Sequence, residues 1–288
     1  MKTAVITTGG LGTRLLTSTK GTPKTMLPLF DKSHDKSNDP LVRPLLEMIF
    51  ENLYDAGFRK FCFIIGGKTK HSILNHMKPD ANFIKLLEKR NTSTDKRFKF
   101  NIQRIYKKIK QSKIAYISQA TPMGFGHALT SASKFVGNDT FLLHAGDAYF
   151  PDYDFLPKFI NQFNKNQNLE GSLLLKKTNN LKGYGIAQIN KVGNSNLIFN
   201  VQEKPKKPLS NLAILPVYVF TSKIFEALKN TKKGYNGELQ VTDAIKTMLD
   251  DNKSISGYIY PHKVWYDIGT AQNYFKAIKT SYSKSTNL

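Results

Sequence analysis

The residues with the clearest chemistry lie in a glycine-rich turn near the start of the chain. A short β-branched run is followed by GGLGTR at residues 9–14 and by PKTMLP at residues 23–28. Glycines that follow a strand let backbone N–H groups approach a phosphate chain or a base closely. Arg14, Lys20 and Lys24 add positive charge that can hold several phosphates. Together these residues predict a nucleoside triphosphate site.

Two better-known glycine motifs do not fit this turn. The Rossmann fingerprint needs a third glycine where Leu15 stands and an acidic residue at the end of a second strand, whereas Asp31 lies in a polar stretch. The Walker A motif needs Gly-Lys-Ser/Thr at the start of a helix, but here Lys20 precedes Gly21 and Pro23 follows soon after. The phosphate site must therefore be of another type.

Further motifs follow along nearly the whole chain: GFGHA at 124–128, AGD at 145–147, GYG at 183–185, EKP at 203–205, NLAI at 211–214, GELQVTDAI at 237–245 and WYDIG at 265–269. In this order they resemble the signature of the sugar nucleotidyltransferases, in particular the glucose-1-phosphate uridylyltransferases (UDP-glucose pyrophosphorylases) of bacteria and archaea. That family usually has proline where Thr17 stands, so the turn there is expected to differ.

The resemblance implies a fold and a reaction. The fold is α/β, a Rossmann-like doubly wound mixed sheet of the nucleotidyltransferase type with a smaller antiparallel sugar-binding part. The reaction is nucleotidyl transfer from UTP to a sugar-1-phosphate, with glucose-1-phosphate the first expectation, giving a UDP-sugar and pyrophosphate with Mg²⁺. The alternatives are an enzyme that uses dTTP or another sugar-1-phosphate, and a non-catalytic regulatory subunit of the same fold.

Such a transfer asks the protein to align two polyanions and offset their repulsion. Arg14 offers a planar fork for the β- and γ-phosphates, and Lys24 a point charge near the α-phosphate. With Asp147 they form the predicted catalytic set. The predicted nucleotide-binding residues are Gly9, Gly10, Gly12, Thr13, Arg14, Lys24, Gln119 and Gly124.

Two carboxylates are the expected metal ligands. Asp147 ends an apolar strand, where ligand sites of such sheets lie, and Asp267 is part of WYDIG. By the resemblance they hold Mg²⁺, which prefers oxygen ligands. The structural alternatives are a turn or helix cap for Asp147 and the N-cap of a helix that starts near Thr270 for Asp267.

The sugar phosphate is expected to meet Gly185, Glu203, Lys204 and Asn211, with Glu238 a weaker candidate. In an extended segment neighbouring side chains point in opposite directions, so Glu203 is expected to meet sugar hydroxyls and Lys204 the phosphate. A backbone amide at Gly185 can approach the sugar, although an ordinary turn is an alternative there.

The base is expected to meet Gln119, whose amide can donate to and accept from one edge of a pyrimidine, with the Gly124 backbone adding a contact. The alternative is that Gln119 only caps a turn. His127 and His144 lack metal-ligand spacing and a nucleophile motif, so both are predicted to be packing or helix-start residues.

The elements that must position these residues alternate in the first half. Strand-like runs at 4–8, 61–66, 114–118 and 140–144 alternate with helix-like runs at 43–56, 83–90, 126–135 and 155–164, which predicts a doubly wound, mainly parallel sheet. Strands at 169–176, 185–190, 197–202 and 213–221 are too close together for crossover helices and predict antiparallel or mixed pairing. Helices at 222–229 and 239–251, a strand pair and a helix from Thr270 follow.

These elements predict one domain over residues 1–288, with 1–150 mainly binding nucleotide and 151–288 forming the sugar-binding and C-terminal half. Residues 32–40 and 91–99 are polar and lack periodicity, so both are predicted to be mobile surface loops. The first interrupts the usual short link into a helix that begins near Leu41.

The composition allows the chain to bury a substantial single core. It has 288 residues, 40% of them hydrophobic, and a net charge of +22 from 43 Lys plus Arg and 21 Asp plus Glu. The excess charge is spread, is densest at 85–113 and accompanies no nucleic-acid motif, so it predicts a solvated lysine-rich surface. Nucleic acid is not expected as a partner, and a homo-oligomer is an open alternative.

Cys62 is the one cysteine, inside the apolar run at 61–65, which predicts a buried strand residue, no disulfide within the chain and a reducing cytoplasm. No apolar run approaches the ~18 residues of a membrane span, and no signal peptide is recognised. We therefore expect a cytoplasmic protein without a membrane partner.

Overall fold

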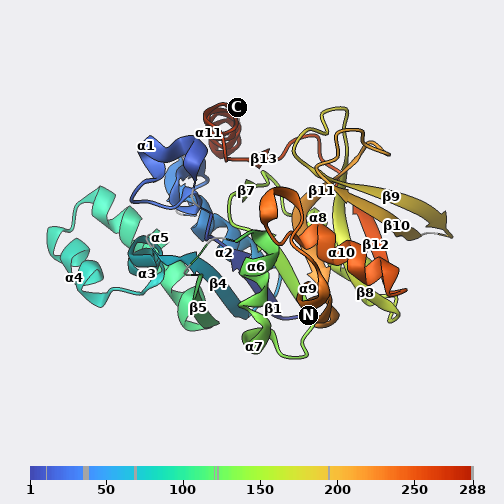
Figure 1. Ribbon diagram of the computed structural model, residues 1–288. Helices are drawn as coiled ribbons and strands as arrows, with labels where there is room; N and C mark the ends of the chain where they lie inside the picture. Colours follow the sequence, from blue (N-terminus) through green and yellow to red (C-terminus); the bar gives the residue numbers. More distant parts are fainter. Residues whose placement is uncertain are drawn as a thin grey trace.

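The computed structural model describes residues 1–10, 12–34, 39–67, 70–119, 121, 123–193 and 195–286, and only the backbone of Thr13 and Leu16. Its largest element is a nine-stranded sheet that extends across both halves of the chain (Figure 1). The strands, in order across this sheet, are β5 (Lys113–Gln119), β4 (Lys60–Gly66), β1 (Thr3–Thr7), β6 (Phe141–Ala145), β11 (Leu212–Phe220), β8 (Leu169–Lys177), β12 (Ser254–Ile259), β10 (Ser195–Glu203) and β9 (Gly185–Val192).

The first four strands of that order run parallel to one another. β11 is antiparallel to both β6 and β8, and it therefore joins the strands of the first half of the chain to those of the second half. β12 is parallel to β8, and β10 is antiparallel to β12 and β9. The predicted parallel first half and mixed second half are confirmed.

The helices are α1 (Leu16–Thr19), α2 (Leu45–Asp55), α3 (Lys70–Met77), α4 (Ala81–Arg90), α5 (Ser93–Lys110), α6 (Phe125–Thr130), α7 (Ser133–Val136), α8 (Phe155–Asn164), α9 (Lys223–Asn230), α10 (Val241–Asp250) and α11 (Ala271–Thr286). Two small antiparallel sheets complete the fold, one of β2 (Pro28–Asp31) and β3 (Leu41–Pro44), the other of β7 (Ala148–Tyr149) and β13 (Tyr266–Asp267).

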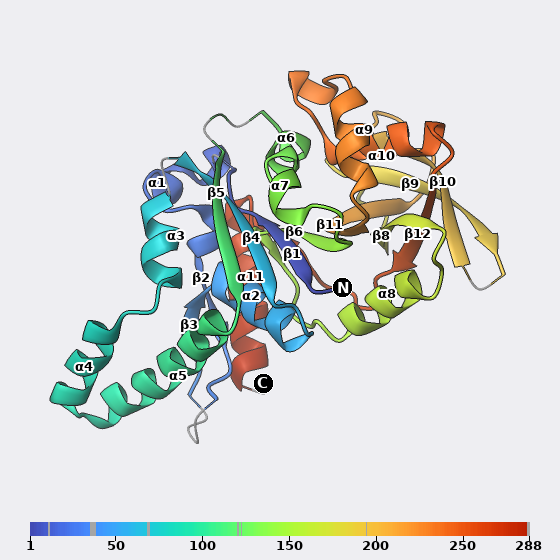
Figure 2. The ribbon, with the colours of Figure 1, turned by 90° about the horizontal axis from the view of Figure 1, so that it is seen from below.

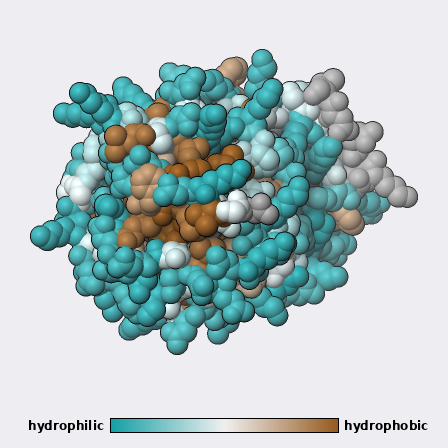
Figure 3. Space-filling model, turned by 90° about the vertical axis from the view of Figure 1, so that its right-hand side faces the viewer, coloured by the Kyte–Doolittle hydropathy of each residue, from teal (hydrophilic) through white to brown (hydrophobic). Residues whose placement is uncertain are grey.

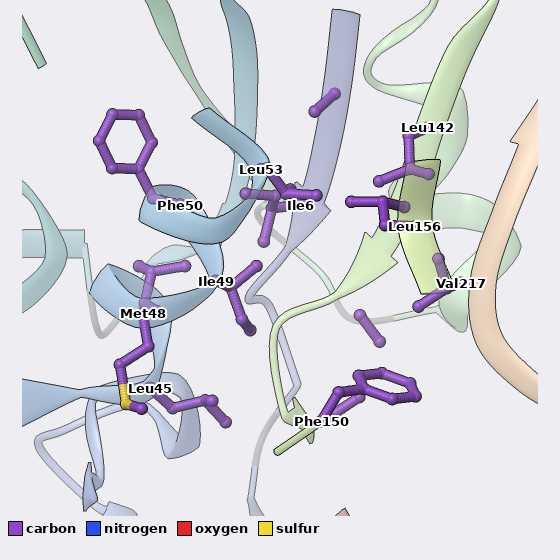
Figure 4. Close-up of a cluster of buried hydrophobic side chains, with 14 of the residues drawn as sticks. Ile6, Leu45, Met48, Ile49, Phe50, Leu53, Leu142, Phe150, Leu156 and Val217 are labelled. Atoms are coloured by element: carbon purple, nitrogen blue, oxygen red, sulfur yellow. The ribbon is translucent and has the colours of Figure 1, made fainter. Parts of the chain in front are cut away.

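The central strands are apolar on both faces because helices cover both. Ala4 and Ile6 of β1 belong to the core under α2 and α8, whereas Val5 belongs to the core under α6, α9 and α10. Figure 2 shows these helix groups on opposite sides of the sheet. In Figure 4, Ile49 and Leu53 of α2 lie beside Ile6. Such alternation in an unbroken apolar run is typical of a covered parallel sheet.

Cys62 lies in β4 and is fully buried, as predicted, and burial raises the pKa of its thiol to about 12. His144 of β6 is also fully buried, as predicted for a packing residue. Its Nδ1 donates to the Ala145 carbonyl, its Nε2 accepts from the Tyr153 hydroxyl at 2.9 Å, and burial lowers its pKa to about 4.

The predicted helix at 43–56 is shorter than expected. Residues 41–44 instead form β3, in which buried and exposed side chains alternate, and it pairs with β2. Pro44 is extended at φ −61° and ψ 140°, so the helix begins only at Leu45. The first predicted insertion thus connects two strands of a hairpin, and its residues 35–38 lie outside the described residues.

The prediction of a loop at 91–99 is wrong, because α5 begins at Ser93. Thr92 accepts a hydrogen bond from the Asp95 backbone, while the Asp95 carboxylate accepts one from the Thr92 backbone. This capping box satisfies the first amides of the helix. Asn91 separates α4 from α5 in a left-handed conformation, with φ of 53°.

The two strands expected before the C-terminal helix form, but they do not pair with each other. β12 enters the main sheet, whereas β13 pairs with β7, so that Asp267 lies opposite Ala148. The helix α11 begins at Ala271, one residue beyond the predicted start. The end of the chain is therefore brought to the carboxyl end of β6.

Figure 3 shows hydrophobic side chains gathered on the side of the molecule that carries β9, β10 and β12, within a mostly hydrophilic surface. The large exposed hydrophobic residues of these three strands are Val192, Phe199 and Ile259. In the part of the chain that the structure describes, none of the helices combines the length and hydrophobicity that a membrane crossing requires.

Candidate functional site

A cavity of about 1020 Å³ lies between the glycine turn, the carboxyl end of β6 and the strands of the second half. Both halves of the chain therefore contribute to its walls. The predicted residues that line it are Gly9, Gly10, Gly12, Arg14, Lys24, Gln119, Gly124, Asp147, Gly185, Glu203, Lys204 and Asp267, together with the weaker candidate Glu238.

Lys24 and Asp147 form the most closely packed ion pair of this cavity. Lys24 Nζ lies 2.5 Å from Asp147 Oδ2, and the lysine side chain is only 12% exposed. Gly146 makes the approach possible: its N–H donates to the Thr7 carbonyl at 2.8 Å, and a Cβ there would come within 2.7 Å of that oxygen. The chain can thus turn tightly past the end of β1 and present Asp147 to Lys24.

Asp267 reaches the same place from the far end of the sequence. The Ile268 N–H donates to the Asp147 carbonyl at 3.0 Å. The Asp267 carboxylate accepts from the Gly269 N–H at 2.8 Å and lies 3.7 Å from an Arg14 guanidinium nitrogen. Burial and the neighbouring Asp147 carboxylate raise the pKa of Asp267, outweighing the nearby Lys24 and Arg14. The two carboxylates repel each other.

The alternative of Asp267 as a helix N-cap is wrong, because Thr270 Oγ1 accepts from the Asn273 N–H at the start of α11. The donor set instead fits Mg²⁺. Two carboxylates that lie close together repel each other, and this repulsion favours a hard cation beside them. Mg²⁺ is commonly held by one or two carboxylates together with substrate phosphates.

A second group of ligand-type residues, Asp31, His34 and Glu51, has atoms within 4.8 Å of one another. Its chemistry is that of an ion-pair network. Glu51 lies 2.7 Å from Arg43 Nη2 and from Lys108 Nζ, and 2.6 Å from Arg104 Nη1. These cations supply the positive charge that a metal would bring, so the cluster is a structural one.

Gln119 is buried at the base of the cavity. Its Nε2 lies 3.0 Å from His127 Nδ1, and its Oε1 lies so close to Gly9 that a Cβ there would come within 2.7 Å of it. The Gln119 amide is therefore oriented by the His127 side chain of α6. This contact differs from the alternative in which Gln119 only caps a turn. His127 was predicted to pack or to start a helix, and it lies in α6 in contact with Gln119.

The prediction that Glu203 and Lys204 point apart is wrong. Lys204 has a φ of +42°, so the chain is not extended there, and Lys204 Nζ lies 2.7 Å from Glu203 Oε1. A left-handed backbone at a non-glycine residue costs free energy and is common at functional sites.

Gly185 pairs with Glu203 in the β9–β10 ladder and lies against Thr242, so the turn alternative for Gly185 is also wrong.

Two expected residues, Asn211 and Lys20, stand apart from the cavity wall. Asn211 is exposed just before β11, where its carbonyl accepts from the Thr178 N–H, and it is not among the lining residues. Lys20 is exposed and likewise outside the lining. Thr13 lies in a 3₁₀ turn at Thr13–Leu15, and its side chain lies outside the described residues.

Several lining residues were not predicted from the sequence: Tyr184, Tyr235, Thr242, Trp265 and Asn273. The rings of Tyr184 and Trp265 pack with centroids 5.8 Å apart in the wall of the same cavity. The Asn-Gly pair that follows Tyr235 is a typical turn sequence. A turn at this place could have been predicted from that pair.

Comparison with known proteins agrees with this geometry. Residues 3–284 match the family described as nucleotidyl transferase, and the chain belongs to that family. It is 31% identical over 273 residues to the UTP–glucose-1-phosphate uridylyltransferase of Bacillus subtilis, covering 93% of this chain and 87% of the relative.

It is also 27% identical over 275 residues to the low-salt glycan biosynthesis nucleotidyltransferase of Haloferax volcanii; this match covers 95% of the chain but only 64% of that relative. Among solved structures, a UDP-glucose pyrophosphorylase complexed with UDP-glucose superposes with a TM-score of 0.81 at 26% identity, and 99% of each chain is covered.

Proposed function

We propose that the chain transfers a uridylyl group from UTP to a sugar-1-phosphate, with glucose-1-phosphate the first substrate, and releases pyrophosphate. The observation that carries the proposal is the composition of one cavity. Lys24, Arg14 and two carboxylates meet in it, and Glu203 and Lys204 line the same cavity. The names of the B. subtilis relative and of the UDP-glucose complex support the choice of substrates.

The proposed step is an in-line displacement. A phosphate oxygen of the sugar-1-phosphate forms a bond to the α-phosphorus of UTP, while the bond from that phosphorus to the bridging oxygen of pyrophosphate breaks. Asp147 and Asp267 would hold Mg²⁺, which when bound neutralises charge on the phosphate oxygens.

The residues of the chain itself supply alignment and charge. Lys24 places a cation where negative charge grows on the α-phosphate, and Arg14 holds the outer phosphates. Gln119 presents one edge of its amide to the base, and Lys204 offers its ammonium to the sugar phosphate. Because these groups are fixed before substrate arrives, little reorganisation is needed during transfer.

The same reasoning supports two further proposals. Because the main sheet is continuous from β5 to β9, we treat residues 1–288 as one catalytic domain with a nucleotide half and a sugar half. The single buried thiol of Cys62 needs no oxidising compartment, which favours the cytoplasm as the place of action.

The test is pyrophosphate release measured with Mg²⁺ over a matrix of nucleoside triphosphates and sugar-1-phosphates. We expect UTP with glucose-1-phosphate to give the highest kcat/KM. If UTP were inactive with every sugar-1-phosphate, the proposal would fail. Inactivity of every pair would favour the non-catalytic regulatory subunit instead.

A further inference from the structure

A tight turn between α9 and α10 brings an aromatic ring to the cavity. The Glu238 N–H donates to the Tyr235 carbonyl at 3.2 Å, and Asn236 and Gly237 both have positive φ, 56° and 71°. This is the geometry of a type I′ turn, for which Asn-Gly is the preferred sequence. A second bond from the Gly234 N–H to the Glu238 carbonyl, at 2.9 Å, closes the loop.

The turn is seated directly on α10. A Cβ at Gly234 would come within 2.1 Å of Asp243 Oδ2, so the backbone of the turn lies against the first turn of that helix. On the other side of the turn, the Glu238 carboxylate accepts from Gln240 Nε2 at 2.9 Å. Both contacts fix the place from which Tyr235 projects, and its ring lines the cavity.

The ammonium of Lys204 lies between two partners. Glu203 Oε1 is 2.7 Å from Lys204 Nζ, and the centroid of the Tyr235 ring is 4.9 Å from the same atom. A ring at this distance attracts a cation through its quadrupole. The two partners differ in charge: the carboxylate neutralises the ammonium, whereas the ring holds it and leaves its positive charge available.

We propose that Tyr235 is a positioning residue that holds the Lys204 ammonium in place for the phosphate of the incoming sugar-1-phosphate. The inference rests on the proposed function. When the anionic phosphate arrives, Glu203 is released to accept from sugar hydroxyls, and the neutral ring keeps Lys204 directed into the cavity without competing for its charge. The left-handed backbone of Lys204 costs free energy, and such backbone is enriched at functional sites, which agrees with a role for this side chain in the cavity.

The test compares Tyr235→Leu, which removes the ring, with Tyr235→Phe, which keeps it, in an enzyme whose wild-type turnover has first been established. A cation–π contact at a partly exposed site corresponds to about a 2- to 10-fold effect. We expect Tyr235→Leu to raise KM for the sugar-1-phosphate by that factor, with KM for UTP unchanged and kcat within about twofold. Tyr235→Phe should restore the wild-type KM.

Two further variants separate positioning from other roles. In a Lys204→Ala background, Tyr235→Leu should have no additional effect, because the cation it positions is gone. Phe199→Leu is the matched control, since its ring is 49% exposed, close to the 48% of Tyr235, and lies on the strand that leads to Lys204.

An unchanged KM in Tyr235→Leu would overturn the inference. So would an equal loss in the Lys204→Ala background, which would mean that the ring contacts the substrate itself, or a matching rise in KM for UTP, which would indicate a general distortion of the cavity. A wild-type chain that releases no pyrophosphate would contradict the proposed function instead, so the two failures are distinguishable.

Discussion

At the scale of single residues, Asp147 is the side chain on which most of the proposed chemistry converges. It pairs with Lys24 and raises the pKa of Asp267 through repulsion. We expect Asp147→Asn to lower kcat by about 100-fold or more, because one of the two carboxylates proposed to hold Mg²⁺ is lost. The thermal midpoint should change little, since the lost pair with Lys24 is offset by relief of the repulsion with Asp267.

Steady-state pyrophosphate release and a thermal melt measure both quantities. Asp139→Asn is the matched control, because Asp139 also lies 2.5 Å from a lysine, Lys60, but outside the cavity. Undiminished turnover in Asp147→Asn, or in the wild type with a chelator, would contradict the metal assignment.

The two lysines of the cavity are expected to affect different kinetic constants. Lys24→Ala should chiefly lower kcat, because the charge that Lys24 meets grows in the transition state. Lys204→Ala should chiefly raise KM for the sugar-1-phosphate, whose charge is already present on binding. Steady-state kinetics with each substrate varied in turn separates these effects, and the reverse pattern would mean that the two roles are exchanged.

The choice of base is expected to depend on Gln119. Uracil and thymine share the same hydrogen-bonding edge and differ by a methyl group, whereas cytosine reverses that edge. The wild type should therefore prefer UTP, then dTTP, with CTP, ATP and GTP far behind. Gln119→Ala should reduce the preference for UTP over CTP without abolishing turnover, as measured by kcat/KM for each nucleotide; a wild type that favours ATP or GTP would refute the base assignment.

At the scale of elements, the start of α5 depends on the capping box of Thr92 and Asp95. Thr92→Ala removes the hydroxyl that accepts from the Asp95 N–H. Amide hydrogen exchange in the first turn of α5 should then accelerate by about 2- to 10-fold, with turnover unchanged. Thr286→Ala at the C-terminal end of α11 is the control, and equal acceleration in both variants would speak against the cap.

The elements that could be predicted from sequence are those whose apolar pattern is strong. β1, β4 and β6 are buried apolar runs between helices on both faces of the sheet, whereas β5 is a partly buried edge strand whose apolar residues still indicated a strand. The start of α5 was missed although Thr92 and Asp95 have capping-box spacing. β3 was missed because four residues with alternating burial are too few to outweigh the helical pattern that follows them.

The site was predictable to the extent that its residues lie in motifs. Asp147 and Gln119 lie at strand ends and Lys24 follows the glycine turn, and that placement suggested a ligand site. The pairing of β13 with β7 involves only two residues of each strand, which is too few to give a recognisable pattern of apolar and polar residues in the sequence. Only the family resemblance therefore predicted that Asp267 lies beside Asp147. The positive φ of Lys204 also had no sequence signal, since left-handed backbone is expected at glycine or asparagine.

At the scale of the whole molecule, the buried network around Glu51 links β3, α2 and α5 and should set the response to acid. Burial alone would raise the pKa of Glu51, but Arg43, Lys108 and Arg104 outweigh it and lower the pKa from its ordinary value of 4.5 to about 2. The unfolded chain therefore binds a proton at higher pH than the folded one. This group stabilises the fold fully above about pH 4.5 and loses that contribution, on the order of 3 kcal/mol, as the pH falls toward 2.

Urea denaturation between pH 7 and pH 3 measures this effect. Glu51→Gln should lower the free energy of unfolding at pH 7 by an amount that shrinks as the pH falls, because the wild type loses the same charge in acid. Glu226→Gln is the control, since its carboxylate is 67% exposed and pairs only with Lys223 among the described ion pairs. A difference between wild type and Glu51→Gln that stayed constant with pH would contradict the assignment.

The late position of Asp267 in the chain has a consequence for the newly synthesised protein. The glycine turn, Lys24 and Asp147 leave the ribosome well before β13 is made, and β13 must still pair with β7 while α11 docks on β2 through the Tyr274 hydroxyl and the Pro28 carbonyl. A growing chain can thus fold its first half before Asp267 has been added. On the proposed metal assignment, a newly made chain would therefore gain its second metal ligand, and with it turnover, only after β13 and α11 have been translated and have docked.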